Sequence, residues 1–327
     1  MQSLKAVLRS LIIAIVVGTA GTTAAQVYPS RPISLIVPYA AGGGADTVAR
    51  IIAERMRASL DQVVIVENAP GASGSIGVGK AARAAPDGYT LVEGNWSTHV
   101  ANGTIYRLNY DVQNDFEPIA LIANSPLLIV GRKSIPANNL QELIVWLKAN
   151  PDKATEGTNG PGSIMHVAGL FFQQQTGTNF QFVPFRGGGL VTTELLAGRI
   201  DLGMSLPPDL LPQVRAGNIK AYAVTSKKRL QAAADVPTVD EAGVPALYAS
   251  AWMGLWAPKN TSKALVAKLN SAVVDTLADP AVRLKLADIG LDVPERDQQS
   301  PEMLKAFQKT EIDKWWPLIK QADIKPE

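Results

Sequence analysis

Blocks of apolar and polar positions along the chain predict strands and helices in turn. An apolar run that begins at Ile33 is followed by three glycines and then by a segment with the periodicity of an amphipathic helix. The apolar positions of that helix are spaced three and four apart, at Val48, Ile51, Ile52 and Met56. A second apolar run lies at 63–66. A strand, a helix and a strand at this spacing form a βαβ unit, which predicts a parallel sheet.

The same alternation continues to the end of the chain. Further strands are predicted at 89–93, 154–158, 181–185, 200–204 and 221–225, and helices at 140–148, 191–197, 263–278 and 301–321. The apolar segment 121–130 is interrupted at 124–126, where we place a crossing between domains. We therefore predict an α/β protein of two domains, one made of 26–125 and 255–327 and the other of 126–254.

The first 25 residues have the features of a secretory signal. Lys5 and Arg9 give a basic start, an apolar run follows at 11–17, and Thr23 to Ala25 form a small-residue cleavage site. The apolar run is too short to span a bilayer comfortably, which disfavours a membrane anchor. We expect cleavage near Gln26 and a periplasmic mature protein.

Charge and cysteine content narrow the function classes. Without Lys5 and Arg9, the chain has 29 basic and 29 acidic residues, so neither a nucleic acid nor an anionic membrane surface is indicated as a partner. The absence of cysteine excludes disulfides, thiolate metal sites and cysteine nucleophiles. An exported protein without disulfides fits a bacterial periplasm.

Two glycine-bearing turns are the candidate binding elements. The first, around Gly42 to Gly44, joins a predicted strand to a helix start, where unpaired amides and the helix dipole favour an anion. A plain structural turn would also use glycine here, and Thr47 stands where a dinucleotide fingerprint needs its third glycine. The second turn, 159–163, follows a strand of the second half. Ligands of open α/β sheets bind at such strand ends, so the two turns could grip one ligand.

Other candidate motifs in the sequence are incomplete. Gly74, Gly79 and Lys80 have the spacing of a phosphate-binding loop, but Ala81 replaces the residue that would hold magnesium. Only two histidines are present, and neither a zinc-protease motif nor a Gly-x-Ser-x-Gly elbow occurs. We expect no cofactor, metal or catalytic residue, and a structural role for His99. The alternative is a secreted serine hydrolase or esterase that uses Ser163 with His166, three residues apart on a helix.

Motifs along nearly the whole chain after residue 25 are similar to those of one family. They include 28–32 (YPSRP), 36–44 (IVPYAAGGG) with Asp46, 66–74 (VENAPGASG), 86–91 (PDGYTL), 162–163 with His166, 183–189 (VPFRGGG) and 236–238 (VPT). The chain resembles the Bug, or TctC-type, extracytoplasmic solute-binding receptors of tripartite tricarboxylate transporters. The resemblance implies a two-domain, clam-shell periplasmic-binding-protein-like fold with a ligand cleft between the domains, and no catalytic activity.

The resemblance also implies site residues and partners. The ligand would be a small carboxylate, a dicarboxylate or an aromatic acid, and the other partners the membrane permease subunits of such a transporter; we expect a monomer. The implied ligand-binding residues are Tyr39, Ala40, Ala41, Gly42, Gly43, Gly44 and Asp46 in the first turn, Asn159, Gly160, Gly162, Ser163 and His166 in the second, and Asn95, Trp96, Ser97 and Arg186 beside them. On structural grounds Asp46 could instead cap its own helix.

Two departures from the family pattern bear on the ligand. Many relatives have an aspartate soon after the strand at 200–204, where this chain reads Ser205-Leu-Pro-Pro-Asp209. This disfavours recognition of an amine and favours a simple carboxylate. Trp96 stands in a loop that is usually built of smaller residues and points to an aromatic or long-chain acid. A sensor subunit with the same binding chemistry is a third possibility.

Overall fold

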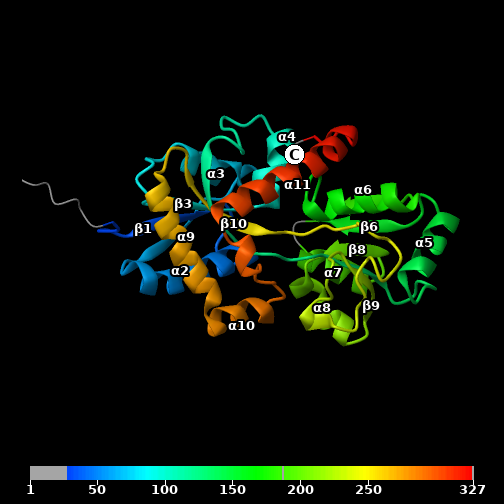
Figure 1. The fold of residues 1–327 in the computed structure, drawn as a ribbon. Helices are drawn as coiled ribbons and strands as arrows, with labels where there is room; N and C mark the ends of the chain where they lie inside the picture. Colours follow the sequence, from blue (N-terminus) through cyan, green and yellow to red (C-terminus); the bar gives the residue numbers. More distant parts are fainter. Residues whose placement is uncertain (1–27, 186–187, 326–327) are drawn as a thin grey trace, which may run out of the picture. The chain divides into compact units, whose positions relative to one another are not determined.

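The computed structural model describes residues 28–185 and 188–325 (Figure 1). The described residues from Arg31 onward form one compact unit. The predicted signal segment and Arg186 lie outside the described residues. Within them, no helix has the length and apolar character needed to cross a membrane.

The first of two sheets has five strands in the order β2-β1-β3-β10-β4. They are β1 (Ile33–Val37), β2 (Val64–Asn68), β3 (Thr90–Asn95), β4 (Phe116–Ala123) and β10 (Met253–Pro258). β1 pairs in parallel with β2 and β3, as predicted, but β10 is antiparallel to both neighbours. The expectation of a fully parallel sheet was wrong, because the chain leaves at Ala123 and re-enters beside it at Met253.

The second sheet also has five strands, in the order β7-β6-β8-β5-β9. They are β5 (Leu128–Arg132), β6 (Thr155–Thr158), β7 (Gln181–Pro184), β8 (Leu202–Ser205) and β9 (Ile219–Val224). β6 is parallel to β7 and β8, whereas β5 is antiparallel to β8 and β9. The predicted α/β class is confirmed, with mixed sheets. The assignment of residues to two domains stays a prediction.

Helices alternate with the strands. They are α2 (Gly44–Leu60), α3 (Ser75–Ala82), α4 (Asn102–Ile105), α5 (Leu140–Ala149), α6 (Ile164–Thr176), α7 (Gly188–Leu196), α8 (Pro207–Arg215), α9 (Lys263–Ala278), α10 (Pro280–Asp288) and α11 (Pro301–Gln321). Short helical turns lie at Ala72–Gly74, Ser97–Ala101, Gln231–Ala233 and Arg296–Gln298. Serines start both long C-terminal helices, since Ser262 and Ser300 each accept a hydrogen bond from the third residue that follows. These caps explain why both helices begin at their predicted first residues.

Buried aromatic side chains hold α11 against the rest of the chain. Trp315 of α11 is edge to face with Trp96, with ring centroids 5.7 Å apart, and with Phe171 of α6 at 5.4 Å. Glu311 Oε2 accepts hydrogen bonds from the indole nitrogens of Trp252 at 3.0 Å and Trp315 at 3.1 Å. α11 therefore contacts both the first sheet, through Trp252, and α6 of the second half.

His99 has the structural role expected of it. Its ring stacks on Trp256 with centroids 3.9 Å apart, and its Nδ1 lies 3.0 Å from Thr98 Oγ1. Burial lowers the pKa of His99 to about 3, so the imidazole is neutral at physiological pH. A Cβ atom on Gly94 would lie 2.1 Å from His99 Nδ1, which explains the glycine at this point of β3.

Candidate ligand-binding site

Three strand ends of the first sheet bring predicted site residues together. Because β1, β2 and β3 are parallel, their carboxyl ends lie on the same side of the sheet. The first turn follows β1, and Asn68 and Asn95 are the last residues of β2 and β3. Tyr39 Oη donates a hydrogen bond to Asn95 Oδ1 at 3.0 Å, and the Tyr39 hydroxyl also interacts with Ser97. Burial raises the pKa of Tyr39, so this hydroxyl stays protonated as a donor.

Asp46 is used inside the first turn. Its Oδ2 accepts hydrogen bonds from the Gly42 amide at 2.8 Å and from Arg50 Nε at 2.9 Å, and its Oδ1 accepts from Asn68 Nδ2 at 2.9 Å. The side chain is only 3% exposed. Arg50, above all, lowers the pKa of Asp46 to about 2. Asp46 thus holds the turn from within, but it reaches the Gly42 amide, one residue before the N-cap Gly43, and does not cap an amide of its own helix.

The remaining amides of the first turn are available to an anion. The Gly42 amide is occupied by Asp46, and Gly42 has the positive φ of 84° that suits glycine. Among residues 28–185 and 188–325, the amides of Gly43, Gly44 and Ala45 have no hydrogen-bond acceptor. The stretch from Ala40 to Gly44 is exposed. An anion at this turn would therefore meet the first amides of α2 and the positive end of its dipole.

The second turn, between β6 and α6, repeats this construction. The Gly162 amide donates to His166 Nδ1 at 3.1 Å, and the His166 amide donates to the helix cap Ser163 Oγ at 3.3 Å. The Ser163 amide donates to the Gly160 carbonyl at 3.2 Å. Within the described chain, the next amides, those of Ile164 and Met165, have no acceptor. In both turns a glycine amide thus donates to the side chain four residues later, and free helix-start amides follow.

The hydrogen bonds of His166 define its role. Since Nδ1 accepts from Gly162, the proton of the neutral ring is placed on Nε2. Burial lowers the pKa of His166, which keeps the ring neutral. Ser163 Oγ accepts from the backbone of His166 and has no hydrogen bond to its ring. The hydroxyl–imidazole contact that a hydrolase needs is therefore not formed between these residues.

The other predicted site residues are placed less favourably or not at all. Trp96 is 1% exposed and packs in the core, so it presents no surface to a ligand in this conformation. Asn159 is exposed, and Gly160 is buried with a φ of 94°. Arg186 is not among the described residues.

The structure also changes the interpretation of Asp209. Its Oδ2 accepts a hydrogen bond from Ser205 Oγ at 3.0 Å, at the carboxyl end of β8. β8 is parallel to β6, so this carboxyl group lies at the same sheet edge as the second turn. Asp209 therefore places a carboxyl group at this side of the sheet, where it is hydrogen-bonded to Ser205, and the preference for a simple carboxylate over an amine-bearing ligand stays a prediction. The sequence signal for this contact is the spacing of four residues between Ser205 and Asp209, just before and within the start of a helix.

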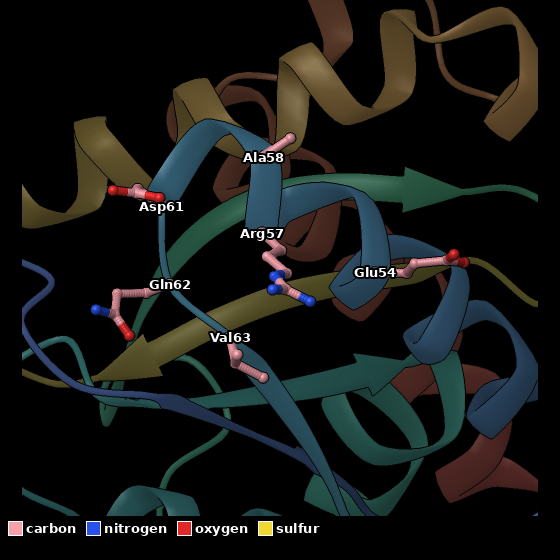
Figure 2. A pocket seen from close by; sticks show the side chains of 6 residues that line it. All are labelled: Glu54, Arg57, Ala58, Asp61, Gln62 and Val63. Atoms are coloured by element: carbon pink, nitrogen blue, oxygen red, sulfur yellow. The ribbon is translucent and has the colours of Figure 1, made fainter.

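Two surface hollows lie outside the two turns. One, of about 370 Å³, is lined by Glu54, Arg57, Ala58, Asp61, Gln62 and Val63. Figure 2 shows these side chains on the end of α2 and the segment that enters β2, at the opposite end of α2 from the first turn. The other, of about 320 Å³, is lined by Ser75, Ile76, Gly79, Arg83, Arg107, Leu108, Asn109 and Tyr110. Neither contains a predicted site residue. No cluster suited to a metal ion occurs in the described part of the chain.

Two mixed α/β sheets with helices between the strands are the fold of periplasmic binding proteins. The periplasmic binding protein BugD shares this fold, with a TM-score of 0.76 and 36% sequence identity over 92% of this chain and 100% of that chain. Residues 48–324 match the model of the TctC family, described as the tripartite tricarboxylate transporter family receptor. The chain belongs to this family, as its motifs predicted.

Two similar structures contain ligands. MatC from Rhodopseudomonas palustris, with bound malate, has a TM-score of 0.76 and 35% identity over 89% of this chain and 100% of its own. The R. palustris protein Rpa4515, with adipate, has a TM-score of 0.78 and 32% identity over 92% of this chain and 100% of its own.

Loss of the Ser163 hydroxyl tests the second turn. We expect Ser163→Ala to cost about 1 kcal/mol of stability, because the cap of α6 is lost, and to weaken carboxylate binding several-fold. Thermal melting and calorimetric titration measure the two effects. Ser262→Ala is the control, since it removes an equivalent cap from α9 and should change stability alone. Ester-hydrolysing activity that the wild type shows and Ser163→Ala loses would instead support the hydrolase.

Proposed function

We propose that the protein captures a small carboxylate, with dicarboxylates favoured, in a cleft between two domains and delivers it to the permease subunits of a tripartite tricarboxylate transporter. The observation that carries this proposal is the pair of helix-start turns with unoccupied amides. The malate and adipate bound by two similar proteins support the dicarboxylate class. The burial of Trp96 supports a dicarboxylate over the aromatic acid that an exposed indole would favour.

Neutral donors suit a receptor that must release its ligand. The free amides of both turns, the Asn95 side-chain amide and the neutral His166 ring can donate to a carboxylate without a buried counter-charge. Each hydrogen bond to a charged group contributes about 1.5–3 kcal/mol, so a few of them, less the cost of closing, give about micromolar affinity. Opening of the two domains then suffices for release.

The proposal includes a location and partners. Family membership supports export to the periplasm, with cleavage of the signal segment near Gln26. The mature protein would act as a monomer without cofactor, metal or nucleic acid. A sensor subunit would share the binding site but present its closed form to a signalling partner.

A ligand panel tests the function. The mature protein, unfolded and refolded to remove endogenous ligand, is melted with mono-, di- and tricarboxylates, aromatic acids and acidic amino acids. A ligand that binds the native state raises Tm, and at one hundred times Kd the gain is about 2.7 kcal/mol. We expect the largest shifts with four- to six-carbon dicarboxylates. No shift with any acid would refute carboxylate capture, and a shift only with aromatic acids would refute the preference for dicarboxylates.

A further inference from the structure

One side chain joins the two ends of the first turn. Asn68, the last residue of β2, donates from Nδ2 to the Tyr39 carbonyl at 3.0 Å and to Asp46 Oδ1 at 2.9 Å. Tyr39 is the first residue of the turn and Asp46 the last. The amide group therefore spans the segment that carries the unoccupied amides, although Asn68 is 22 residues away from Asp46 in the sequence.

Arg50 completes a ring of hydrogen bonds. Its Nε donates to Asp46 Oδ2 at 2.9 Å, and its Nη2 donates to Asn68 Oδ1 at 3.3 Å. Asn68 thus uses both its donor and its acceptor atoms, and this pattern fixes which way its amide group is turned. With the Gly42 amide on Asp46 Oδ2, five hydrogen bonds connect the turn, β2 and α2 with one another, four of them made by residues of the turn.

The turn needs such support because its own side chains cannot provide it. From Ala40 to Gly44 it consists of alanine and glycine, all exposed. Gly43, the N-cap residue of α2, has no side chain that could cap the helix. Glycine loses more conformational freedom than other residues when it is ordered, so a free glycine turn would have to be ordered by the ligand. Order that is already present in the unliganded protein increases affinity.

We propose that Asn68 is a positioning residue of the carboxylate site, which holds the Gly43 and Gly44 amides in their binding orientation without touching the ligand. This inference rests on the proposed function. Asparagine is specifically suited to the position, because it offers donors to a carbonyl and a carboxylate together. An aspartate there would place a second carboxylate beside Asp46, and one proton would have to be taken up to restore a donor.

The experiment compares Asn68→Ala with a matched control, Asn270→Ala. Asn270 Nδ2 also donates to two acceptors, the carbonyls of Ile119 at 2.8 Å and Gln299 at 2.7 Å, outside the turn. Both variants should lower Tm. Only Asn68→Ala should weaken malate or adipate binding, by about tenfold, which corresponds to about 1.4 kcal/mol. Equal weakening by both variants, or unchanged affinity in Asn68→Ala, would overturn the inference.

A second variant gives a readout that a purely structural role would not change. Relative to the wild type at the same two pH values, Asn68→Asp should bind malate or adipate about tenfold more weakly at pH 8 than at pH 5, because protonation of the paired carboxyls restores a donor. The wild-type ratio corrects for titration of the ligand's own carboxyl groups. A flat profile for Asn68→Asp would contradict the proposal. If Asn68→Ala does not fold, the pH dependence of Asn68→Asp still tests whether Asn68 positions the turn.

Amide exchange separates the inference from the proposed function. In the ligand-free protein, the Gly42 amide should exchange about tenfold faster in Asn68→Ala than in the wild type or in Asn270→Ala, since its acceptor Asp46 is no longer held. If the wild type binds no carboxylate, the proposed function fails, and this exchange rate still shows whether Asn68 orders the turn. Unchanged Gly42 exchange would show that it does not.

Discussion

Asp46→Ala is expected to weaken carboxylate binding by about a hundredfold or more and to cost about 2–4 kcal/mol of stability. The substitution leaves the Gly42 amide, the Arg50 guanidinium and one Asn68 N–H without their acceptor. It also leaves the positive charge of Arg50 unpaired at the turn. Calorimetric titration with malate or adipate and urea unfolding measure the two losses.

Asp201→Ala is the matched control for this prediction. Asp201 also receives several donors, namely Arg132 Nε at 2.7 Å, the Thr155 amide at 2.9 Å and Thr155 Oγ1 at 3.1 Å. Asp201 immediately precedes β8 and so lies at the amino ends of β6 and β8, whereas the second turn lies at the carboxyl end of β6. Its removal should cost comparable stability and leave affinity within about twofold. If Asp46→Ala retained wild-type affinity despite the loss of stability, the first turn would not be the anion-binding element.

Glu93→Gln is expected to stabilise the protein above pH 8 by about 2 kcal/mol or more. Both carboxyl oxygens of Glu93 are buried in β3 without a hydrogen-bond partner among the described residues. Burial, aided by the charge of Asp46, raises the pKa of Glu93 from 4.5 to about 8. The folded state therefore keeps a proton that the unfolded chain releases, and stability falls as the pH rises from about 4.5 to about 8. A glutamine is neutral throughout and removes this loss.

Urea unfolding of the wild type and Glu93→Gln at pH 5, 7 and 9 measures the effect. The two curves should converge at pH 5 and diverge above it. Glu54→Gln controls for the change in net charge, because Glu54 is on the surface, near Lys285. A wild-type stability that does not fall between pH 5 and pH 9 would show that the Glu93 carboxyl is solvated or paired in solution.

Much of the architecture could be predicted from local patterns. The first βαβ unit and the long helices α9 and α11 have clear periodicity and caps, and these decide local structure. β10 could not be predicted in the same way. All six of its residues are buried, so it shows no alternation, and its pairing with β3 and β4 depends on contacts distant in sequence.

The two turns of the candidate site could be predicted from the sequence, but the hydrogen bonds within them could not. Glycine turns at strand ends indicate free amides, but the sequence does not show which of these amides donate hydrogen bonds to the protein's own side chains. Gly42 and Gly162 are used in this way because Asp46 and His166 turn back toward them. Asn68 was not among the predicted site residues because the apolar run was taken to end at residue 66, whereas β2 extends to Asn68. Trp96 was predicted to face the ligand, but a position just after a strand does not determine the direction of the side chain, and this one points into the core.

The contact between Trp315 and Phe171 gives the protein an intrinsic optical probe. Phe171 belongs to α6, the helix whose first residues follow the second turn, and Trp315 shares Glu311 Oε2 with Trp252. Any ligand-driven shift of α6 would change the surroundings of Trp315 and hence its emission. Fluorescence of the unmodified protein could then follow capture and release in real time, without a label or a coupled transport assay.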